Sequence, residues 1–171
     1  AFINIAGDDT DKLIKLASPP SPDRRYLRGS LIPNMLESAV LNSRYYETFG
    51  LFELTQVFSK GAVSPSIEAE KLPVQERRLA IALAGVLPFL VFRRLKGMLA
   101  QLPRYGRVKE WEFKQSGDKM PWADRNAWLK IVNDEGDELG SLGLLSPKAT
   151  EESGLRIPCL ALAEINIEKL V

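Results

Sequence analysis

The amino-acid sequence predicts an α+β fold, in which helices flank a mainly antiparallel sheet. Several segments alternate between apolar and polar residues, as strands with one buried face do. Turn residues join two of these segments directly, in the run Asn133-Asp134-Glu135-Gly136-Asp137, which is typical of a β-hairpin. Other segments repeat apolar residues at helical spacing. With 171 residues the chain can bury a substantial core, and we expect residues 1–171 to form one domain.

The expected strands are short runs with alternating or strongly apolar character. The run at 77–86 is rich enough in Ala, Leu and Ile to be a central strand, although a helix is an alternative there. A strand at 51–58 has one partly polar face, which carries Glu53 and Thr55. The full set of expected strands is 2–5, 51–58, 77–86, 108–115, 126–132, 139–145 and 160–167.

The helix expected over residues 31–49 has the clearest local signals. Ser30 suits the N-cap, Pro33 falls in the first turn, and Gly50 follows the expected end. Its two apolar flanks have two explanations: one flank packs against another subunit, or the helix is buried within its own domain. The first flank consists of Ile32, Leu36, Ala39, Val40, Ser43 and Tyr46, and the second of Met35, Leu41 and Tyr45.

Three further helices are expected. Residues 89–102 have helical apolar spacing, and Pro103 is expected to end that helix. Ser146 and Pro147 begin a short helix, which Gly154 ends. Residues 8–16 form the third. The segments 18–23 and 59–73 are rich in turn residues and are expected to be loops, the first of them an ordered loop inside the domain.

Composition excludes several kinds of chemistry. The chain has no histidine, which removes Ser-His and Cys-His nucleophiles and histidine-based metal sites. The single Cys159 cannot form an internal disulfide, and its apolar surroundings predict a buried, inert thiol. The longest apolar run, 79–92, is too short to span a bilayer, and the N-terminal residues do not resemble a signal peptide. We therefore expect no membrane partner and a cytoplasmic location.

One basic cluster has two interpretations. It contacts RNA phosphates, or it is the solvated face of a helix. Its members are Arg93, Arg94, Lys96, Arg104, Arg107 and Lys109, with no acidic residue before Glu110. Three tryptophans are candidate stacking platforms for bases. Trp111 and Trp128 are expected in the core or on a sheet face, and Trp122 is expected to be the most exposed of the three.

The order of several motifs resembles the central, synthetase-like core of the phenylalanyl-tRNA synthetase beta chain of bacterial type. The earlier motifs are ASPPSP at 17–22, LRGSLIP at 27–33 and LFELTQVF at 51–58. The later ones are FRRLKG at 92–97, LGSLGLLSP at 139–147 and AEINI at 163–167. Each motif is only moderately specific, but their order covers nearly the whole chain.

This resemblance implies the fold of a class II aminoacyl-tRNA synthetase without its catalytic residues. In catalytic relatives, a strand like 51–58 leads into an arginine that holds the α-phosphate of ATP, with an acidic residue close behind. Ser59 and Gly61 occupy those places here. A serine cannot neutralise the charge that develops during adenylyl transfer. We therefore expect no catalytic, cofactor-binding or metal-binding residue in this domain, with ATP and magnesium bound by the partner catalytic subunit.

The resemblance also implies a scaffolding role in phenylalanine attachment to tRNA. The expected partner is the catalytic alpha subunit, in a heterotetramer, and any tRNA contact is expected to be indirect. Candidate residues for the subunit interface are Ile32, Met35, Leu36, Ala39, Val40 and Tyr46. The alternative is a stand-alone RNA- or regulator-binding paralogue that uses the basic cluster, and an independent enzyme is a third interpretation.

Three departures from the family pattern favour a divergent member or a distant paralogue. The segment between Gly85 and Phe92 is shorter than in the family. Residues 120–125 replace a turn that resembles His-Pro-Gly-Arg, and Ser146 stands where a histidine often precedes the proline.

Overall fold

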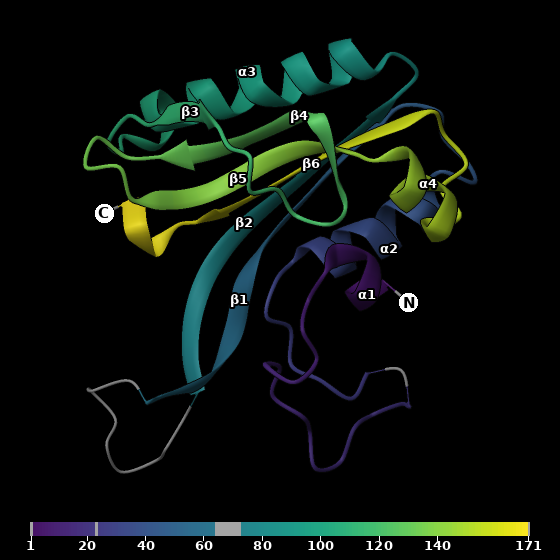
Figure 1. The fold of residues 1–171 in the computed structure, drawn as a ribbon, viewed down its shortest axis with the longest axis vertical. Coiled ribbons are helices and arrows are strands. Elements are labelled where there is room, and N and C mark those ends of the chain that lie inside the picture. The colour runs from purple at the N-terminus through teal and green to yellow at the C-terminus, as the bar shows by residue number, and fades with distance from the viewer. Residues whose placement is uncertain (1, 23, 64–72, 171) are drawn as a thin grey trace.

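The computed structural model describes residues 2–22, 24–63 and 73–170. Its centre is a six-stranded sheet with strand order β1-β2-β6-β5-β4-β3, in which all neighbouring strands are antiparallel (Figure 1). The sheet confirms the predicted α+β class. Its strands are β1 (Phe49–Val63), β2 (Pro73–Gly85), β3 (Glu112–Gln115), β4 (Ala123–Val132), β5 (Glu138–Leu145) and β6 (Cys159–Asn166).

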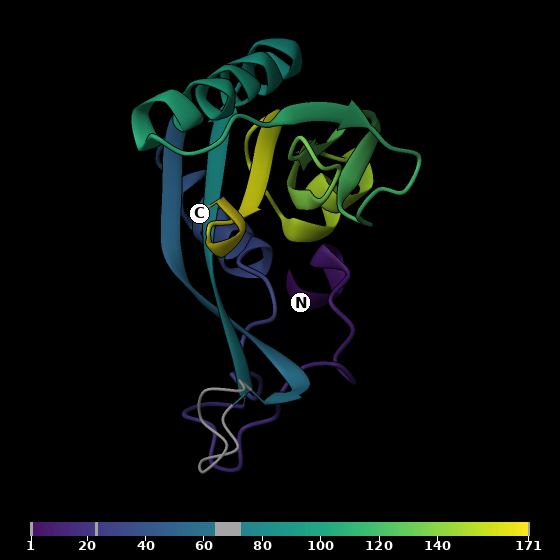
Figure 2. The same cartoon turned by 90° about the vertical axis from the view of Figure 1, so that its left-hand side faces the viewer.

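The helices divide between the two faces of the sheet. The long helix α3 (Pro88–Gly106) lies on one face. The helices α1 (Phe2–Ala6), α2 (Ile32–Asn42) and α4 (Pro147–Ser153) gather on the other, as Figures 1 and 2 show. A short 3₁₀ turn, η2 (Glu168–Leu170), follows β6. None of the helices in the described ranges is both long and apolar enough to cross a membrane.

Each face of the sheet has its own hydrophobic cluster. On the α2 face, Ala80, Ala82 and Ala84 of β2 belong to one buried cluster with Met35 and Leu36 of α2. On the α3 face, a second buried cluster joins Leu95 and Leu99 of α3 to Ile81 of β2 and Ala161 and Ala163 of β6. Residues paired across antiparallel strands share a face, and residues two apart along a strand do too. The strand pattern therefore decides which helix each side chain meets.

Several predicted elements are confirmed. The predicted strands at 51–58 and 126–132 lie within β1 and β4, and the predicted hairpin is the pair β4–β5. The predicted cap of α4 is also present, because the Ser146 hydroxyl accepts the Ala149 backbone N–H at 3.2 Å and Gly154 ends the helix at φ +71°. Cys159 is buried, as predicted; its thiol donates to the Gly85 carbonyl at 3.0 Å, and burial raises its pKa.

Two predictions near the N-terminus are wrong. Residues 2–5 form most of helix α1 rather than a strand. Phe2 and Ile5, three residues apart, both pack against the buried cluster of the α2 face, and four residues are too few to distinguish this spacing from alternation. Residues 8–16 form turns instead of a helix, and Lys15 forms an isolated bridge with Tyr26.

The predicted helix over 31–49 is too long. Helix α2 ends at Asn42, and Gly50 lies inside β1 rather than beyond a helix. The Ser43 hydroxyl donates to the Val40 carbonyl at 2.8 Å, so its polar group competes with continued helix at this point. The loop predicted for 59–73 is also too long, because β1 continues to Val63 and β2 begins at Pro73; the residues between them lie outside the described ranges.

Three further predictions need correction. Helix α3 continues through Pro103 to Gly106 and ends where Arg107 adopts a left-handed conformation at φ 53°. Only the last four residues of the strand predicted at 108–115 form β3. Trp122, predicted to be the most exposed tryptophan, is only 1% exposed. Its ring packs edge-on against Trp128 with the ring centroids 5.5 Å apart, so an apolar contact outweighs the polar character of its loop.

Candidate functional site

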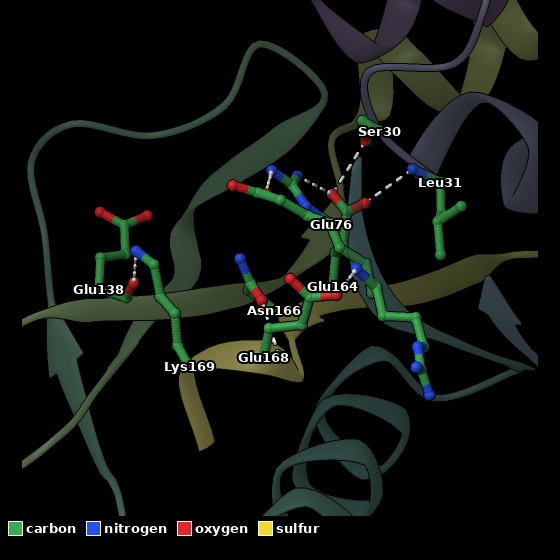
Figure 3. Close-up of polar contacts among 10 residues, drawn as sticks. Ser30, Leu31, Glu76, Glu138, Glu164, Asn166, Glu168 and Lys169 are labelled. Atoms are coloured by element: carbon green, nitrogen blue, oxygen red, sulfur yellow. Dashed lines mark hydrogen bonds and ion pairs between the residues drawn. The ribbon is translucent and has the colours of Figure 1, made fainter. Parts of the chain in front are cut away.

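A cluster of charged side chains lies on the α2 face of the sheet, beside the start of α2 (Figure 3). Glu76 and Arg78 project from β2, and Glu164 and Asn166 project from β6. Arg78 pairs with Asn166 across the two strands, and Glu164 pairs with Ala80. The antiparallel register therefore places all four polar side chains on one face.

Glu164 connects the sheet to helix α2. One carboxylate oxygen accepts the Leu31 backbone N–H at 2.7 Å, and the other accepts the Ser30 hydroxyl at 2.9 Å (Figure 3). The Ser30 oxygen in turn accepts the Ile32 N–H at 3.1 Å. A carboxylate is favourable at this end of a helix because unpaired N–H groups point outward there. The N-cap position is thus Leu31 and not the predicted Ser30, and Glu164 and Ser30 together accept the first N–H groups of the helix.

Arg78 is held between two carboxylates. Its Nη2 lies 2.9 Å from Glu76 Oε2, and its Nη1 lies 3.5 Å from Glu164 Oε2. Its Nε is buried and has no hydrogen-bond partner in the described part of the chain. Asp8 adds another acidic group: burial, the largest cause, and the nearby Glu164 charge together raise the pKa of Asp8 to about 6, against the opposing effect of Arg78. The cluster therefore contains more acidic groups than Arg78 alone can neutralise.

A second set of polar contacts anchors the chain before α2 to the edge strand β1. Arg28 Nη1 lies 2.8 Å from Glu53 Oε1, and its Nε donates to the Gln56 carbonyl at 3.0 Å. The Arg28 carbonyl accepts the Phe58 N–H at 2.8 Å. This segment therefore covers one end of the free edge of β1, which would otherwise present unpaired backbone groups.

Ser59, which is predicted to replace the arginine of catalytic relatives, follows this anchored part of β1 and is exposed. The next residue, Lys60, points its ammonium group to the Asp11 carbonyl at 3.1 Å. Neither residue supplies a guanidinium for a phosphate.

A cavity of about 420 Å³ lies next to the charged cluster. Glu138, Ser141 and Lys169 line it together with Glu76, Arg78, Glu164 and Asn166. Most of its charged groups already bind one another: Lys169 Nζ donates to the Glu138 carbonyl at 3.0 Å, and the Glu138 carboxylate lies 2.9 Å from Lys130 Nζ. Over the described ranges, no group of three or more His, Cys, Asp or Glu residues is arranged to hold a metal ion. These contacts chiefly hold α2, β2, β5 and β6 together.

The predicted interface residues separate into two groups. Ile32, Met35, Leu36 and Ala39 are at most 3% exposed and pack within this chain's own core, so none of them is open to a partner. Val40 is half-buried, and Tyr46 is 60% exposed. Leu41 and Tyr45, from the second predicted flank, are also exposed. We define the α2 surface as Val40, Leu41, Tyr45 and Tyr46. The subunit interface stays a prediction, and among the residues of this region these four are the ones that a partner could contact.

The predicted RNA-contact residues all lie on the opposite face of the sheet. Four of them project from α3, and the other two follow it in the chain. All six are exposed: Arg93, Arg94, Lys96, Arg104, Arg107 and Lys109. The sheet lies between α3, which carries four of them, and helix α2 (Figures 1 and 2).

Three residues of the charged cluster were missed in the sequence. Glu164 and Arg78 were assigned only to strands, and Asp8 only to a helix. A signal for Glu164 was present, because it follows Leu160 and Leu162 at alternate positions and so continues an inward-facing row. No comparable signal marks Asp8, whose burial depends on how a turn-rich segment folds back.

Three comparisons with known proteins agree on the fold. A family profile described as the phenylalanyl tRNA synthetase beta chain CLM domain matches residues 1–167. The phenylalanine–tRNA ligase beta subunit of Borrelia garinii subsp. bavariensis is 28% identical over 170 residues, and that of Borrelia hermsii is 25% identical. These matches cover 99% of this chain but 28% of each relative, so the chain spans little more than a quarter of their length.

A solved structure extends the fold comparison. The pyrrolysyl-tRNA synthetase of Desulfitobacterium hafniense superimposes with a TM-score of 0.72 at 16% sequence identity, covering 99% of this chain and 56% of that one. At this identity the likeness concerns the fold, which is that of a class II tRNA synthetase core. With the family profile covering nearly every residue, the chain belongs to the family of phenylalanyl-tRNA synthetase beta chain CLM domains.

Proposed function

We propose that this domain is a non-catalytic scaffold, which supports phenylalanine attachment to tRNA by holding the catalytic alpha subunit. The observation that carries the proposal is that the charged groups of the polar cluster are bound to one another and to the backbone. Glu164 caps α2, Arg78 pairs with Glu76 and Glu164, and Ser59 stands where a catalytic relative has arginine. A synthetase site needs free cationic groups directed at the reacting phosphate, whereas these groups stabilise the fold.

The α2 surface supplies the proposed contact with the alpha subunit. Leu41, in the last turn of α2, is 52% exposed, and Tyr45 and Tyr46, which follow the helix, are 80% and 60% exposed. Residues on the other side of α2 are buried. Tyrosine is enriched in protein interfaces because it combines a large apolar ring with a hydrogen-bonding group. The buried residues Ile32, Met35, Leu36 and Ala39 would fix the orientation of this surface without contacting the partner.

One experiment tests catalysis and another tests the contact. The purified chain, supplied with phenylalanine, ATP and magnesium, is expected to form no phenylalanyl adenylate in a pyrophosphate-exchange assay. Mixed with the alpha subunit, it is expected to form a complex in sedimentation velocity. Adenylate formation by the chain alone would refute the non-catalytic role.

A matched pair of variants locates the contact. Tyr46→Arg is expected to weaken the complex about tenfold or more, since a charge replaces an apolar contact at the interface. Tyr105→Arg, which changes an even more exposed tyrosine on α3 (79% against 60% for Tyr46), is the control and is expected to leave the affinity unchanged. Equal losses in the two variants would place the interface elsewhere.

A further inference from the structure

Positive charge is concentrated in one segment of this nearly neutral chain. Residues 93–109 contain six cationic side chains and no acidic one. Because the whole chain has a net charge of +1, the rest of it carries a net charge of −5. An overall charge near zero therefore conceals a strongly basic segment on an otherwise acidic molecule, which is the electrostatic pattern of a surface for a polyanion.

The structure turns this segment into a single exposed surface, the outer face of α3. Val91, Leu95 and Leu99 pack the inner face of the helix against the sheet. None of the six cations has an ion pair or side-chain hydrogen bond to any described residue. The nearest acidic residues in sequence are Glu110 and Glu112, and Glu112 lies 3.9 Å from Lys114. The cations are thus available to a ligand.

Two of these cations form cation–π contacts with aromatic rings. The Arg93 guanidinium lies 5.2 Å from the centre of the Phe89 ring, and Lys96 Nζ lies 5.2 Å from the centre of the Phe113 ring. Such contacts orient a cation without neutralising its charge. Phe89 is itself 66% exposed at the start of α3, and Tyr105 is 79% exposed near its end. Exposed rings therefore lie near both ends of the basic surface.

Small residues occupy the centre of the same face. Arg93, Gly97, Ala100 and Arg104 follow one another at steps of four, three and four residues, so they form one stripe along the helix. A Cβ added at Gly97 would meet nothing within 4 Å, so the space above the stripe is open. With about 1.5 Å of rise per residue, Arg93 and Arg104 are about 16 Å apart along the axis. A ligand backbone can approach the helix closely between the two arginines.

We propose that the outer face of α3 binds single-stranded RNA, with Arg93, Lys96 and Arg104 contacting phosphates and Phe89 and Tyr105 stacking on bases. Guanidinium groups fit phosphate oxygens with paired hydrogen bonds, and exposed rings stack on unpaired bases of any sequence. Val91, Leu95 and Leu99 are packed on the sheet and cannot insert into a lipid surface, whereas Leu90 and Met98 of α3 stay exposed. Binding to anionic vesicles is therefore one outcome of the test. This proposal goes beyond the scaffolding role and does not depend on it.

Fluorescence anisotropy with a labelled single-stranded RNA of about 20 nucleotides tests the proposal. Binding by the chain is expected to weaken with salt, with a slope of log K against log[salt] of about −2 to −4, for three to six phosphate contacts. The double variant Arg93→Glu/Arg104→Glu is expected to lose at least about tenfold in affinity and to flatten the slope by about 1 to 2. Phe89→Ala/Tyr105→Ala is expected to lose affinity by a similar factor with an unchanged slope, since stacking releases no counterions.

A control variant separates a local effect from a change in net charge. Lys12→Glu/Lys148→Glu changes the net charge equally, but its sites lie outside α3, and both lysines are more than 80% exposed. It is expected to retain the RNA affinity of the parent chain. Absence of RNA binding at low salt, or equal losses in the arginine and lysine variants, would overturn the proposal. Preferential binding to vesicles of anionic lipid, lost in the arginine variant, would also overturn it in favour of a membrane surface.

Discussion

Asp8 is the residue whose ionisation bears most directly on the stability of the α2 face. Burial and the Glu164 charge raise its pKa from 3.8 to about 6, so the folded chain favours the protonated acid. The resulting penalty is absent well below pH 3.8, grows as the pH rises toward 6, and is constant above that. Asp8→Asn is therefore expected to stabilise the chain near neutral pH, by about 1 kcal/mol after allowance for the partial exposure of the side chain.

Urea unfolding of this variant at about pH 7.5 and about pH 4 provides the measurement. The stabilisation is expected to be clear at the higher pH and much smaller at the lower one. Asp11→Asn, at an exposed aspartate nearby, is the matched control and is expected to change little at either pH. Equal stabilisation by Asp8→Asn at both pH values would show that the charge is not the cause.

Glu164 stabilises the fold, in contrast to Asp8. Its carboxylate forms hydrogen bonds and an ion pair, and its side chain is only 13% exposed. Glu164→Ala removes acceptors from the Leu31 N–H and the Ser30 hydroxyl and leaves Arg78 with one carboxylate partner. We expect a loss of about 2 to 3 kcal/mol in unfolding free energy. Glu164→Gln keeps one acceptor and is expected to lose about half as much. Because the glutamine is neutral, it should also lower the pKa of Asp8, which NMR titration of the Asp8 carboxyl would measure.

At the scale of elements, two glycines in regular structure differ in whether their position can accept a side chain. A Cβ at Gly140 of β5 would overlap the Glu164 carbonyl oxygen in the neighbouring strand, and backbone cannot move aside cheaply. Gly140→Ala is therefore expected to destabilise the sheet by about 3 kcal/mol. At Gly97 of α3 the added Cβ meets nothing, and alanine favours helix, so Gly97→Ala is expected to stabilise the chain by about 0.5 to 1 kcal/mol.

Thermal unfolding followed by circular dichroism would compare these two glycine variants. Their effects are expected to have opposite signs. Similar effects from both would mean that conformational freedom, and not the close approach of β5 to β6, decides the role of Gly140.

The elements also show what could be predicted from the sequence. The hairpin and α4 were predictable because each has both a periodic pattern and its own turn or capping residues. The two longest strands were predicted only in part, since 51–58 covers about half of β1 and a helix stayed an alternative for 77–86. The N-terminal residues lacked both: α1 has only five residues, and the turns at 8–16 are determined by packing on distant parts of the chain. The ends of α2 and α3 were missed for a similar reason, since Ser43 and Pro103 act through contacts that the sequence does not display.

The candidate site follows the same rule. The absence of an arginine at position 59 and the basic cluster of 93–109 were both visible in the sequence. The contacts of Glu164, Arg78 and Asp8 were not, because they join residues up to 134 positions apart. The sequence pattern identified α2 as an apolar helix but could not say which of its sides the sheet covers.

On the scale of the whole molecule, the sheet separates two surfaces of different chemistry. The α2 surface presents two tyrosines and two aliphatic side chains, while the outer face of α3 presents aromatic rings and cations that form no ion pair with the described residues. The polar cluster connects α2 to β2 and β6 and takes no part in either surface. A scaffold with this arrangement has room for a protein on one face and for RNA on the other.

The two proposed ligands are therefore expected to bind independently. A ligand alters the affinity of another only if the two share contacts or a conformational change, and in the described part of the chain the sheet lies between α2 and α3. The RNA affinity measured by anisotropy, in buffer of constant salt, should then differ by less than about twofold with and without saturating alpha subunit. The comparison requires a control in which the alpha subunit alone shows no RNA binding at that concentration. Arg93→Glu/Arg104→Glu should abolish RNA binding in the complex while leaving the complex intact, and Tyr46→Arg should do the reverse. Displacement of RNA by the alpha subunit would instead mean that the two ligands compete for one face, and that the scaffold holds them in turn rather than together.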